Sequence, residues 1–523
     1  MIDTKSPLYE ELNKDWKATC RIVLGDEIGE LKDFNGWLKD YIPEFGKRKS
    51  HVSGKDVVFA RKDYCADASF ISLDELKERA IEPLTINEIK DIDSLAQAVS
   101  EKWEYAGSKE IGNSKFVEES DNIIDSQYVA ESANIRKSSH IYSSYFANDG
   151  SKYVFGGNWV VNGEFLIKSQ GRNVKRTFDN NWSEDCSDAY FSFFNIGCSE
   201  IMFCFFQRNR RHAIGNLQLD REKYAGLKRK LLDEVVQELK KSKSFPSIYS
   251  MVPNEKPKIS IRPMIRDEKG DIEPMRKAFS TTFNVIFKKE PGDMVEYEQW
   301  LMRHIMRAPE LKSPFGSKVY RSDSIDEFWR FPEKRIISQD ESVEMGLADI
   351  HMDEPQFGSI ESIRKGLWKI GFFVGRLWMQ ERNCIDCPLA YRGVNMYKVN
   401  DTGYSENGGM CGTLLDSKYV FGCNRVVNSQ FCIDCYHSFT LNRCFELDAC
   451  TKCTDSMFSH NCEGLTESMF CFNVKGKRHA IGNYSLPVEQ YRKIRDSLVG
   501  QMGDEIIKNK TLKWDIYNVG CAK

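Results

Sequence analysis

The chain has 523 residues, of which 41% are hydrophobic and 29% are charged, and its formal net charge is -3. This composition is typical of a soluble protein with a length of roughly three or four domains. The near-neutral charge removes the usual electrostatic argument for nucleic-acid binding. The first residues lack the basic and apolar regions of a secretory signal, and no apolar stretch is long enough to span a bilayer.

The first predicted element is a strand at residues 20–24, which are rich in β-branched residues. An amphipathic helix carrying Trp37 and Leu38 is expected to follow it, with the tryptophan as a core anchor. We assign these elements to an α/β unit at residues 1–118.

A nine-residue period begins at Asp121 and continues to Asn216. A fixed short period is typical of a solenoid, because each repeat must stack on the next to bury its apolar side. Two nonapeptides would form a coil of 18 residues, so we predict a parallel β-solenoid at residues 119–216.

Apolar residues at helical spacing follow at residues 219–241. This pattern predicts a helix at residues 217–243 that caps one end of the solenoid. Three prolines then interrupt a polar stretch, which indicates a linker at residues 244–262.

The same order of elements recurs in the second half of the chain. A strand at residues 283–287 and a helix carrying Trp300 and Leu301 open an α/β unit at residues 263–384. An apolar stretch at residues 366–379 predicts a buried core helix, with a partner-facing helix as the alternative. A second capping helix and a tail are expected at residues 484–523, with helical spacing at residues 488–502.

The two halves are also alike in sequence. Tyr-Val-Phe-Gly at residues 153–156 recurs at residues 419–422, and Arg-His-Ala-Ile-Gly-Asn at residues 211–216 recurs at residues 478–483. Between residues 185–216 and 452–483, 16 of the 32 aligned positions are identical. This identity predicts a tandem duplication.

Cysteines mark the nine-residue period in the second half. Five cysteines follow one another at nine-residue steps, namely Cys435, Cys444, Cys453, Cys462 and Cys471. We therefore predict a Cys-rich β-solenoid at residues 385–483. The segment resembles uncharacterised Cys-rich repeat proteins of reduced-genome microbes and large phages, a resemblance that implies no activity.

Three pairs of cysteines have the spacing of metal ligands. A C-x2-C pair is repeated at a spacing that approaches that of a four-thiolate zinc site. The candidate zinc ligands are Cys384, Cys387, Cys432, Cys435, Cys450 and Cys453. The alternatives are a ladder of small core side chains, which the repeat itself would generate, and a redox function. Because no secretory signal is present, we expect reduced thiols rather than a disulfide framework.

Other candidates for chemistry are few. His212 and His479 stand in the repeated Arg-His-Ala-Ile-Gly-Asn motif, where Gly215 and Gly482 indicate a turn. Aspartates at 188 and 455 and glutamates at 200 and 467 survive in both halves. They could act as an acid/base pair in a carbohydrate groove, or lie on a solvated face. No phosphate-binding, dinucleotide-binding or hydrolase motif is present.

The sequence therefore predicts an α+β protein made of two tandem halves, each with an α/β unit, a parallel β-solenoid and a capping helix. We expect a structural or scaffolding protein that binds protein partners or assembles with itself, in the cytoplasm or in a virus particle. No cofactor is expected except a possible zinc ion, and no membrane, nucleic acid or small-molecule substrate is indicated. A zinc-binding interaction module and a carbohydrate-active β-helix enzyme are the alternatives.

Overall fold

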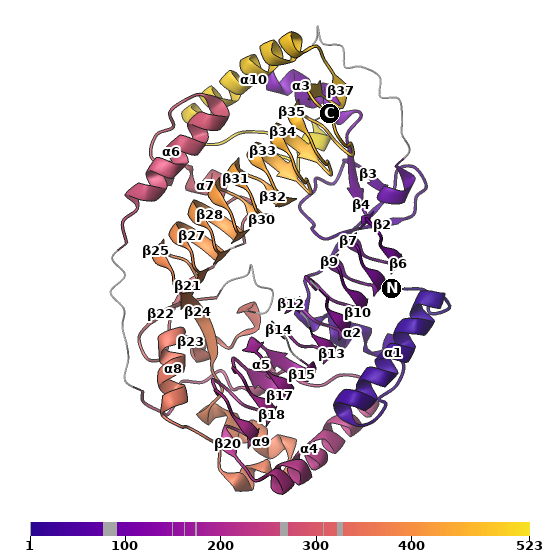
Figure 1. Ribbon diagram of the computed structural model, residues 1–523, viewed down its shortest axis with the longest axis vertical. Coiled ribbons are helices and arrows are strands. Elements are labelled where there is room, and N and C mark those ends of the chain that lie inside the picture. Colours follow the sequence, from indigo (N-terminus) through magenta and orange to yellow (C-terminus); the bar gives the residue numbers. More distant parts are fainter. Residues whose placement is uncertain are drawn as a thin grey trace.

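The computed structural model describes residues 2–76, 91–148, 150–161, 163–172, 175–261, 270–306, 308–321 and 328–522. It mixes helices with many parallel strands, as predicted (Figure 1). The boundary predicted between the linker and the second α/β unit, at 262/263, lies outside the described residues.

Two long arrays of parallel strands form the body of the molecule. The first stack (residues 109–218) holds the strands β5 Glu110–Ile111, β6 Lys115–Glu118, β7 Asp121–Ile124, β8 Gln127–Ala130, β9 Ala133–Arg136, β10 Ser139–Tyr142, β11 Lys152–Phe155, β12 Val160–Val161, β13 Glu164–Ile167, β14 Gly171–Arg172, β15 Lys175–Asn181, β16 Ser183–Glu184, β17 Ser187–Phe193, β18 Ser199–Met202, β19 Arg211–Ile214 and β20 Leu217–Gln218. Only its last pair, β19 with β20, is antiparallel.

The second stack (residues 373–485) is built in the same way. Its strands are β24 Phe373–Met379, β25 Arg382–Ile385, β26 Leu389–Tyr391, β27 Val394–Gly403, β28 Glu406–Leu415, β29 Lys418–Phe421, β30 Asn424–Val427, β31 Gln430–Ile433, β32 Tyr436–Phe439, β33 Asn442–Asp448, β34 Thr454–His460, β35 Thr466–Met469, β36 Ala480–Ile481 and β37 Tyr484–Ser485. Six of them pair in a closed cycle, in the order β28, β29, β31, β33, β32 and β30.

Paired strands in both stacks are twelve residues apart at most positions. Ser187 pairs with Ser199, which pairs with Arg211, and Cys432 pairs with Cys444. The predicted coil of 18 residues is therefore wrong. A step of 13 residues at Ser139/Lys152 and a step of 11 at Glu164/Lys175 cancel one another.

The underlying unit is three residues long. Between Asn122 and Phe146 every third residue has a φ of 47–64°, in the left-handed region, so the chain turns a corner after each triplet. The side chains inside the second stack, from Cys387 to Ala480, are all separated by multiples of three residues. The nine-residue spacing of the cysteines is three such triplets.

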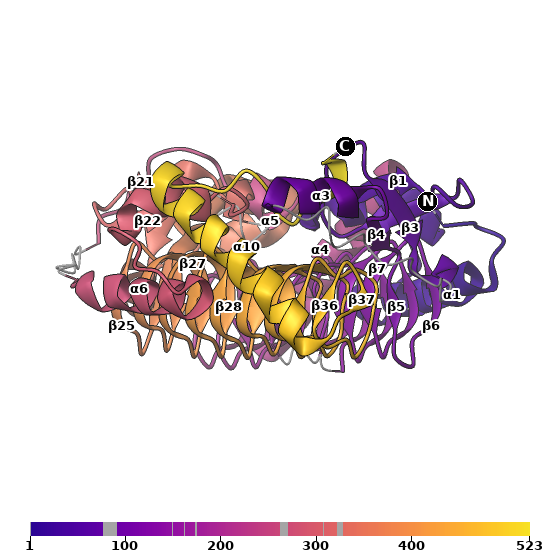
Figure 2. The ribbon, with the colours of Figure 1, turned by 90° about the horizontal axis from the view of Figure 1, so that it is seen from above.

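Helices lie along the outer flanks of the stacks (Figures 1 and 2). Helix α1 (Pro7–Leu24) crosses strands β6 to β15 of the first stack, and α6 (Glu273–Phe287) crosses strands β27 to β33 of the second. The strands predicted at 20–24 and 283–287 are wrong, because these residues complete helices. Their buried side chains follow a helical period, as Leu12, Trp16, Cys20 and Val23 do in α1.

Short helices follow each of them. Helices α2 (Asn35–Leu38) and α7 (Glu298–Leu301) hold the predicted Trp-Leu pairs, and both tryptophans are buried. Helices α4 (Arg221–Ser242) and α10 (Val488–Asn509) confirm the helices predicted at 219–241 and 488–502.

Two smaller units complete the fold. The N-terminal unit (residues 46–107) holds β1 Gly46–Lys49, β2 Asp56–Phe59, β3 Ser69–Ser72, α3 Ile92–Ser100 and β4 Glu104–Gly107. The central unit (residues 310–371) holds β21 Glu310–Lys312, β22 Lys318–Tyr320, β23 Ile336–Ser338, α8 Gln339–Leu347 and α9 Ile360–Gly366. The helix predicted at 366–379 is wrong, because β24 begins at Phe373 and pairs with β23. At Gly375 an added Cβ would meet Tyr320 O at 2.4 Å, so this strand needs a glycine for the close approach.

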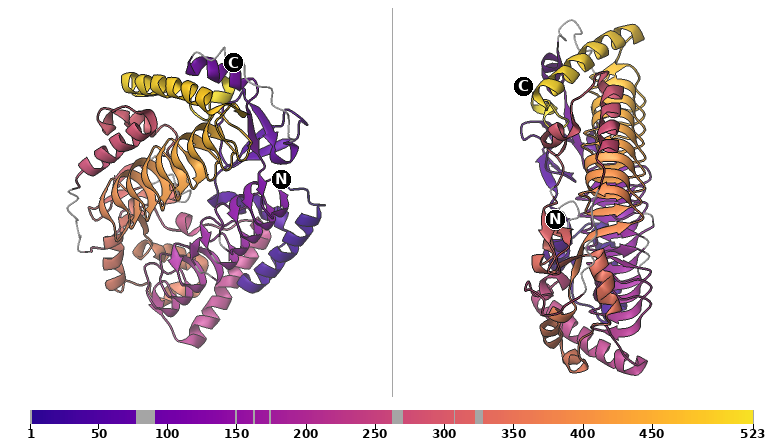
Figure 3. Two further views of the ribbon diagram at one scale, coloured as in Figure 1. Left: turned by 45° about the horizontal axis from the view of Figure 1, so that its top comes forward. Right: turned by 90° about the vertical axis from the view of Figure 1, so that its left-hand side faces the viewer.

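Each unit covers the end of the stack that belongs to the other half of the chain. Met352 N of the central unit's segment donates to Gly215 O at the end of the first stack (2.8 Å). Ala106 N of the N-terminal unit donates to His460 Nε2 of the second stack (3.1 Å). The right-hand view of Figure 3 shows the stacks as one layer, with both termini on its opposite side.

The chain also crosses between halves at its tail. A disulfide joins Cys65 of the N-terminal unit to Cys521, whereas the sequence favoured reduced thiols; the other 15 cysteines are free. The predicted linker holds α5 (Ile248–Met251), and Ile248 N donates to Asp179 Oδ2 (2.7 Å). In the C-terminal tail, Ile516 N donates to Glu446 Oε2 in the same way (2.8 Å).

Candidate functional site

The predicted metal-binding cysteines line the interior of the second stack. Five of the six are buried, and Cys384 is partly exposed. Cys432 lies beside Cys444, its partner twelve residues on, rather than beside Cys450 as an 18-residue coil would require. Ser, Cys, Val and Leu alternate at these interior positions.

Cysteine and serine make the same contacts at these positions. Cys450 Sγ donates to Asp448 O and to Ser459 O, at 3.3 Å each, while Cys450 N donates to Ser438 Oγ at 3.0 Å. Cys423 Sγ likewise accepts from Cys435 N (3.1 Å). Burial raises the pKa of Cys432, Cys435 and Cys450 well above the ordinary range of a thiol. The arrangement favours neutral thiols, although a metal ligand must be a thiolate.

Ligand atoms converge elsewhere. Within the part of the chain that the structure describes, one group of three or more His, Cys, Asp or Glu ligand atoms lies within 4.8 Å of one another, and it consists of Glu11, Asp15 and His140. None of the six candidate cysteines belongs to it. The zinc site on the cysteines stays a prediction.

The carboxylates shared by both halves are engaged in ion pairs. Arg176 pairs with Asp188 (2.6 Å) and His212 with Glu200 (2.7 Å) in the first stack. The equivalent pairs in the second stack are Arg443 with Asp455 (2.6 Å) and His479 with Glu467 (2.9 Å). In each pair the partners are twelve residues apart, so they stand on neighbouring coils of one column.

The repeated Arg-His-Ala-Ile-Gly-Asn motif ends each stack. Gly215 and Gly482 have positive φ values of 56° and 55°, as their role in a turn predicts. Asn216 Oδ1 accepts from Phe205 N, and Asn483 Oδ1 accepts from Phe472 N, each at 2.8 Å. The asparagine thereby satisfies an amide that the next coil would otherwise pair.

The densest group of buried titratable side chains surrounds Asp448, at the end of β33. Its Oδ2 accepts from Tyr64 OH (2.6 Å) and from His460 Nδ1 (3.0 Å), and its Oδ1 lies 3.3 Å from His437 Nδ1. Burial alone would raise the pKa of Asp448, but the two imidazoles hold it well below the usual range. Burial in turn lowers the pKa of His437 to about 4.

This arrangement fixes the protonation of the site. His460 Nε2 accepts from Ala106 N, so its proton is on Nδ1, where it serves Asp448. Both ring nitrogens are occupied, which leaves His460 without a free position for a general base. The group instead holds the N-terminal unit against the second stack.

A second buried group lies on the same face of the second stack. Arg303 pairs with Asp434 (3.1 Å) and with Glu446, and His304 pairs with Asp515 (3.1 Å). Burial raises the pKa of Asp434 to about 7, and Arg303 opposes this shift.

The first stack has its own buried pair at the equivalent place. Lys168 binds Asp40 (2.7 Å), so the cation and the anion have exchanged sides relative to Arg303 and Asp434.

Sequence reasoning did not find the Asp448 group or the Glu11, Asp15 and His140 group. Their members are far apart in sequence, as Tyr64 and Asp448 are. The one signal available was the three-residue spacing of outward side chains, which places His140 in a column with Tyr128 and Tyr153.

Among the described residues, no helix combines the length and the apolar character needed to cross a membrane. No family model, no curated protein and no solved structure matches this chain.

Proposed function

We propose that the two stacks are β-solenoids with coils of twelve residues, that the halves arose by tandem duplication, and that the chain is a non-enzymatic structural or scaffolding protein. It would hold partners or its own subunits in an assembly, such as a virus particle or a large cytoplasmic complex. The regular twelve-residue register and the matching ion pairs of the two halves support this reading.

The reciprocal covering of the stack ends carries the proposal. An open strand edge recruits further strands, and structural proteins protect such edges. Here the N-terminal unit covers the second stack through Tyr64 and Ala106, and the central unit's segment covers the first through Met352. The halves brace one another, which suits a rigid part of an assembly.

The carboxylates speak against the carbohydrate-active alternative. A glycosidase needs two carboxyl groups on either side of a bound sugar. Asp188, Glu200, Asp455 and Glu467 are each held by a cation on a neighbouring coil. These pairs favour a structural role for the column.

Sedimentation tests the proposal directly. In a gently lysed extract of cells that make the protein, we expect it to sediment well beyond its own mass of 60.4 kDa. Chemical crosslinking in that fraction should connect its lysines to a small, reproducible set of partners or to a second copy. Sedimentation only as the free chain, or glycan hydrolysis that Glu200→Gln or Glu467→Gln abolishes, would overturn the proposal.

The zinc-binding module remains the second candidate, because Cys432 and Cys435, and likewise Cys450 and Cys453, are hydrogen-bonded neighbours in the stack interior. Elemental analysis of the purified chain tests it together with a thiol count under denaturing, non-reducing conditions. About 15 titratable thiols without zinc removal beforehand, and no zinc lost on Cys450→Ser, would leave the cysteines as packing residues.

A further inference from the structure

A column of stacked rings runs along the outside of the first stack. Neighbouring ring centroids are 4.8–5.0 Å apart, and the members are Phe116, Tyr128, His140, Tyr153 and Phe165. His140 is held between two tyrosines, so its ring plane is fixed before any ligand arrives. Burial lowers the pKa of His140, which favours the neutral imidazole that binds metals.

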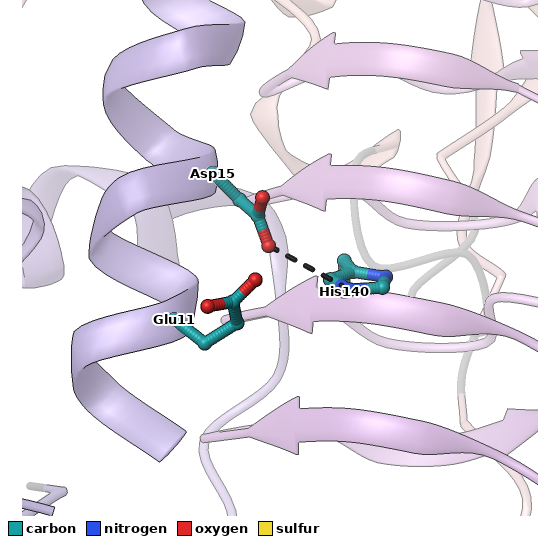
Figure 4. Close-up of side chains that lie close together, drawn as sticks. All are labelled: Glu11, Asp15 and His140. Atoms are coloured by element: carbon teal, nitrogen blue, oxygen red, sulfur yellow. Dashed lines mark ion pairs between the residues drawn. The ribbon is translucent and has the colours of Figure 1, made fainter. Parts of the chain in front are cut away.

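Helix α1 presents two carboxylates to this imidazole. Glu11 and Asp15 are four residues apart and therefore lie one turn apart on the same face of the helix. Figure 4 shows both side chains on the side of α1 that faces His140. One ligand atom from each of the three residues lies within 4.8 Å of the other two.

The direct contacts do not satisfy these groups. Asp15 Oδ2 is 3.7 Å from His140 Nε2, which is beyond hydrogen-bond distance. Asp15 Oδ2 and His140 Nδ1 are both buried atoms without a hydrogen-bond partner. Burial and the neighbouring Glu11 carboxylate raise the pKa of Asp15 to about 6. A buried carboxylate that lacks donors and faces a second carboxylate is costly unless a cation compensates it.

The second half of the chain provides an internal comparison. The positions equivalent to Glu11, Asp15 and His140 are Pro274, Ala278 and Asn407. Asn407 belongs to a column of amides in which Asn395 Nδ2 donates to Asn407 Oδ1 (2.9 Å). The three groups therefore occur together in one half and are absent together from the other, where the column satisfies itself.

We propose that Glu11, Asp15 and His140 bind a divalent transition-metal ion of the Zn²⁺ or Mn²⁺ class, which staples α1 to the first stack. One imidazole and two carboxylates suit these ions better than Ca²⁺ or Mg²⁺, which prefer oxygen ligands alone. Two carboxylates balance the charge of a dication. Glu11 is the most exposed of the three and can turn toward the ion at little cost. Water would complete the coordination.

Manganese titration tests the proposal, because Mn²⁺ prefers oxygen and nitrogen ligands and avoids the many thiols of the second stack. The full chain, treated with chelator and then freed of it, is titrated with Mn²⁺. Bound ion is measured by the loss of the free-ion signal in electron paramagnetic resonance. We expect about one bound ion per chain, displaced by Zn²⁺, and a higher thermal unfolding midpoint for the loaded protein.

Variants taken from the other half keep the test sharp. His140→Asn and Asp15→Ala introduce the residues found at the equivalent positions, so they should fold, and each should weaken binding by at least about tenfold. Glu11→Gln alters an exposed side chain and provides a third variant. The control is His212→Asn, which removes a histidine paired with a single carboxylate, and should leave binding unchanged.

Two results would overturn the proposal. One is the absence of Mn²⁺ and Zn²⁺ binding to the wild-type chain at millimolar concentration, which would leave a plain ion pair between Asp15 and His140. The other is binding that survives in the folded His140→Asn variant. Neither result bears on the scaffold proposal, which depends on sedimentation.

Discussion

At the residue scale, single polar side chains close the open ends of the stacks. Asn483 Oδ1 accepts from Phe472 N, and Asn483 Nδ2 donates to Phe472 O, so one amide satisfies both backbone groups of that residue. Asn216 has the same acceptor role in the first stack. The motif that the sequence repeats most faithfully is thus the one that terminates strand pairing.

Replacing this asparagine tests its role. Asn483→Ala leaves a buried N–H and a buried C=O without partners, and each such group costs about 1–3 kcal/mol. We expect urea unfolding to show a loss of about 2 kcal/mol or more. Asn473→Ala, in a partly exposed column, is the matched control and should cost much less. Equal losses for the two variants would contradict the cap.

Asp179 makes stability depend on pH in the first stack. Burial raises its pKa to about 6, above its ordinary value of 3.8, although Lys168, Tyr41 and Ile248 N oppose the shift. The folded state therefore keeps a proton that the unfolded chain releases. This contribution to stability is complete below about pH 4 and is lost as the pH rises through about 6.

The size follows from about 1.4 kcal/mol per unit of pKa, which gives roughly 3 kcal/mol as an upper estimate. In Asp179→Asn this pH dependence should disappear, so the difference in unfolding free energy between variant and wild type should change between pH 4 and pH 7. Urea unfolding at four pH values measures it. Parallel curves for the two proteins would count against a raised pKa.

At the element scale, the stacks depend on small interior side chains. Ser438, Cys450 and Cys462 stand twelve residues apart, and serine and cysteine both bond to backbone groups there. The interior therefore accepts either residue, provided that its side chain is small and can donate to a carbonyl.

This equivalence predicts a ranking of substitutions at Cys450. Cys450→Ser keeps the donor and should cost about 1 kcal/mol or less, whereas Cys450→Leu overfills the interior and should cost about 1–3 kcal/mol. Thermal unfolding of both variants checks the order. A large loss for serine that added zinc reverses in the wild type alone would instead indicate a metal ligand.

The sequence allowed prediction of some elements and not others. The helices at 221–242 and 488–509 are long and periodic, so their apolar spacing was sufficient. The run at 20–24 is too short to show whether its period is two or 3.6, and its β-branched residues misled. The coil length was missed because cysteine occupies only some triplets, and its nine-residue spacing concealed the three-residue unit. The Asp448 and His140 groups arise from contacts between distant segments, which no local pattern records.

At the scale of the whole molecule, the two halves exchange their covering units. The disulfide between Cys65 and Cys521 ties the N-terminal unit to the tail that lies on the second stack. Arg425 of the second stack also lies over the ring of Tyr145 in the first, 4.4 Å from its centroid. The halves therefore hold one another at more than one place.

Opening the disulfide should loosen one junction and spare the other. In Cys65→Ala/Cys521→Ala we expect faster hydrogen exchange in residues 46–72 and 454–485. The first stack and its contact with the central unit should keep their protection. A uniform change across both stacks would show that the junctions are not independent. Cys20→Ala, which alters a buried free thiol under α1, is the control.

The exchange of covering units ties the lengths of the two stacks together. Adding a coil of twelve residues to one stack would advance its far end by one strand spacing, about 4.8 Å. The unit seated there also leads into the other stack, so that stack would have to gain a coil to keep its own cover in place. Coil number is therefore a shared dimension, and viable length variants of this protein should change both stacks in step.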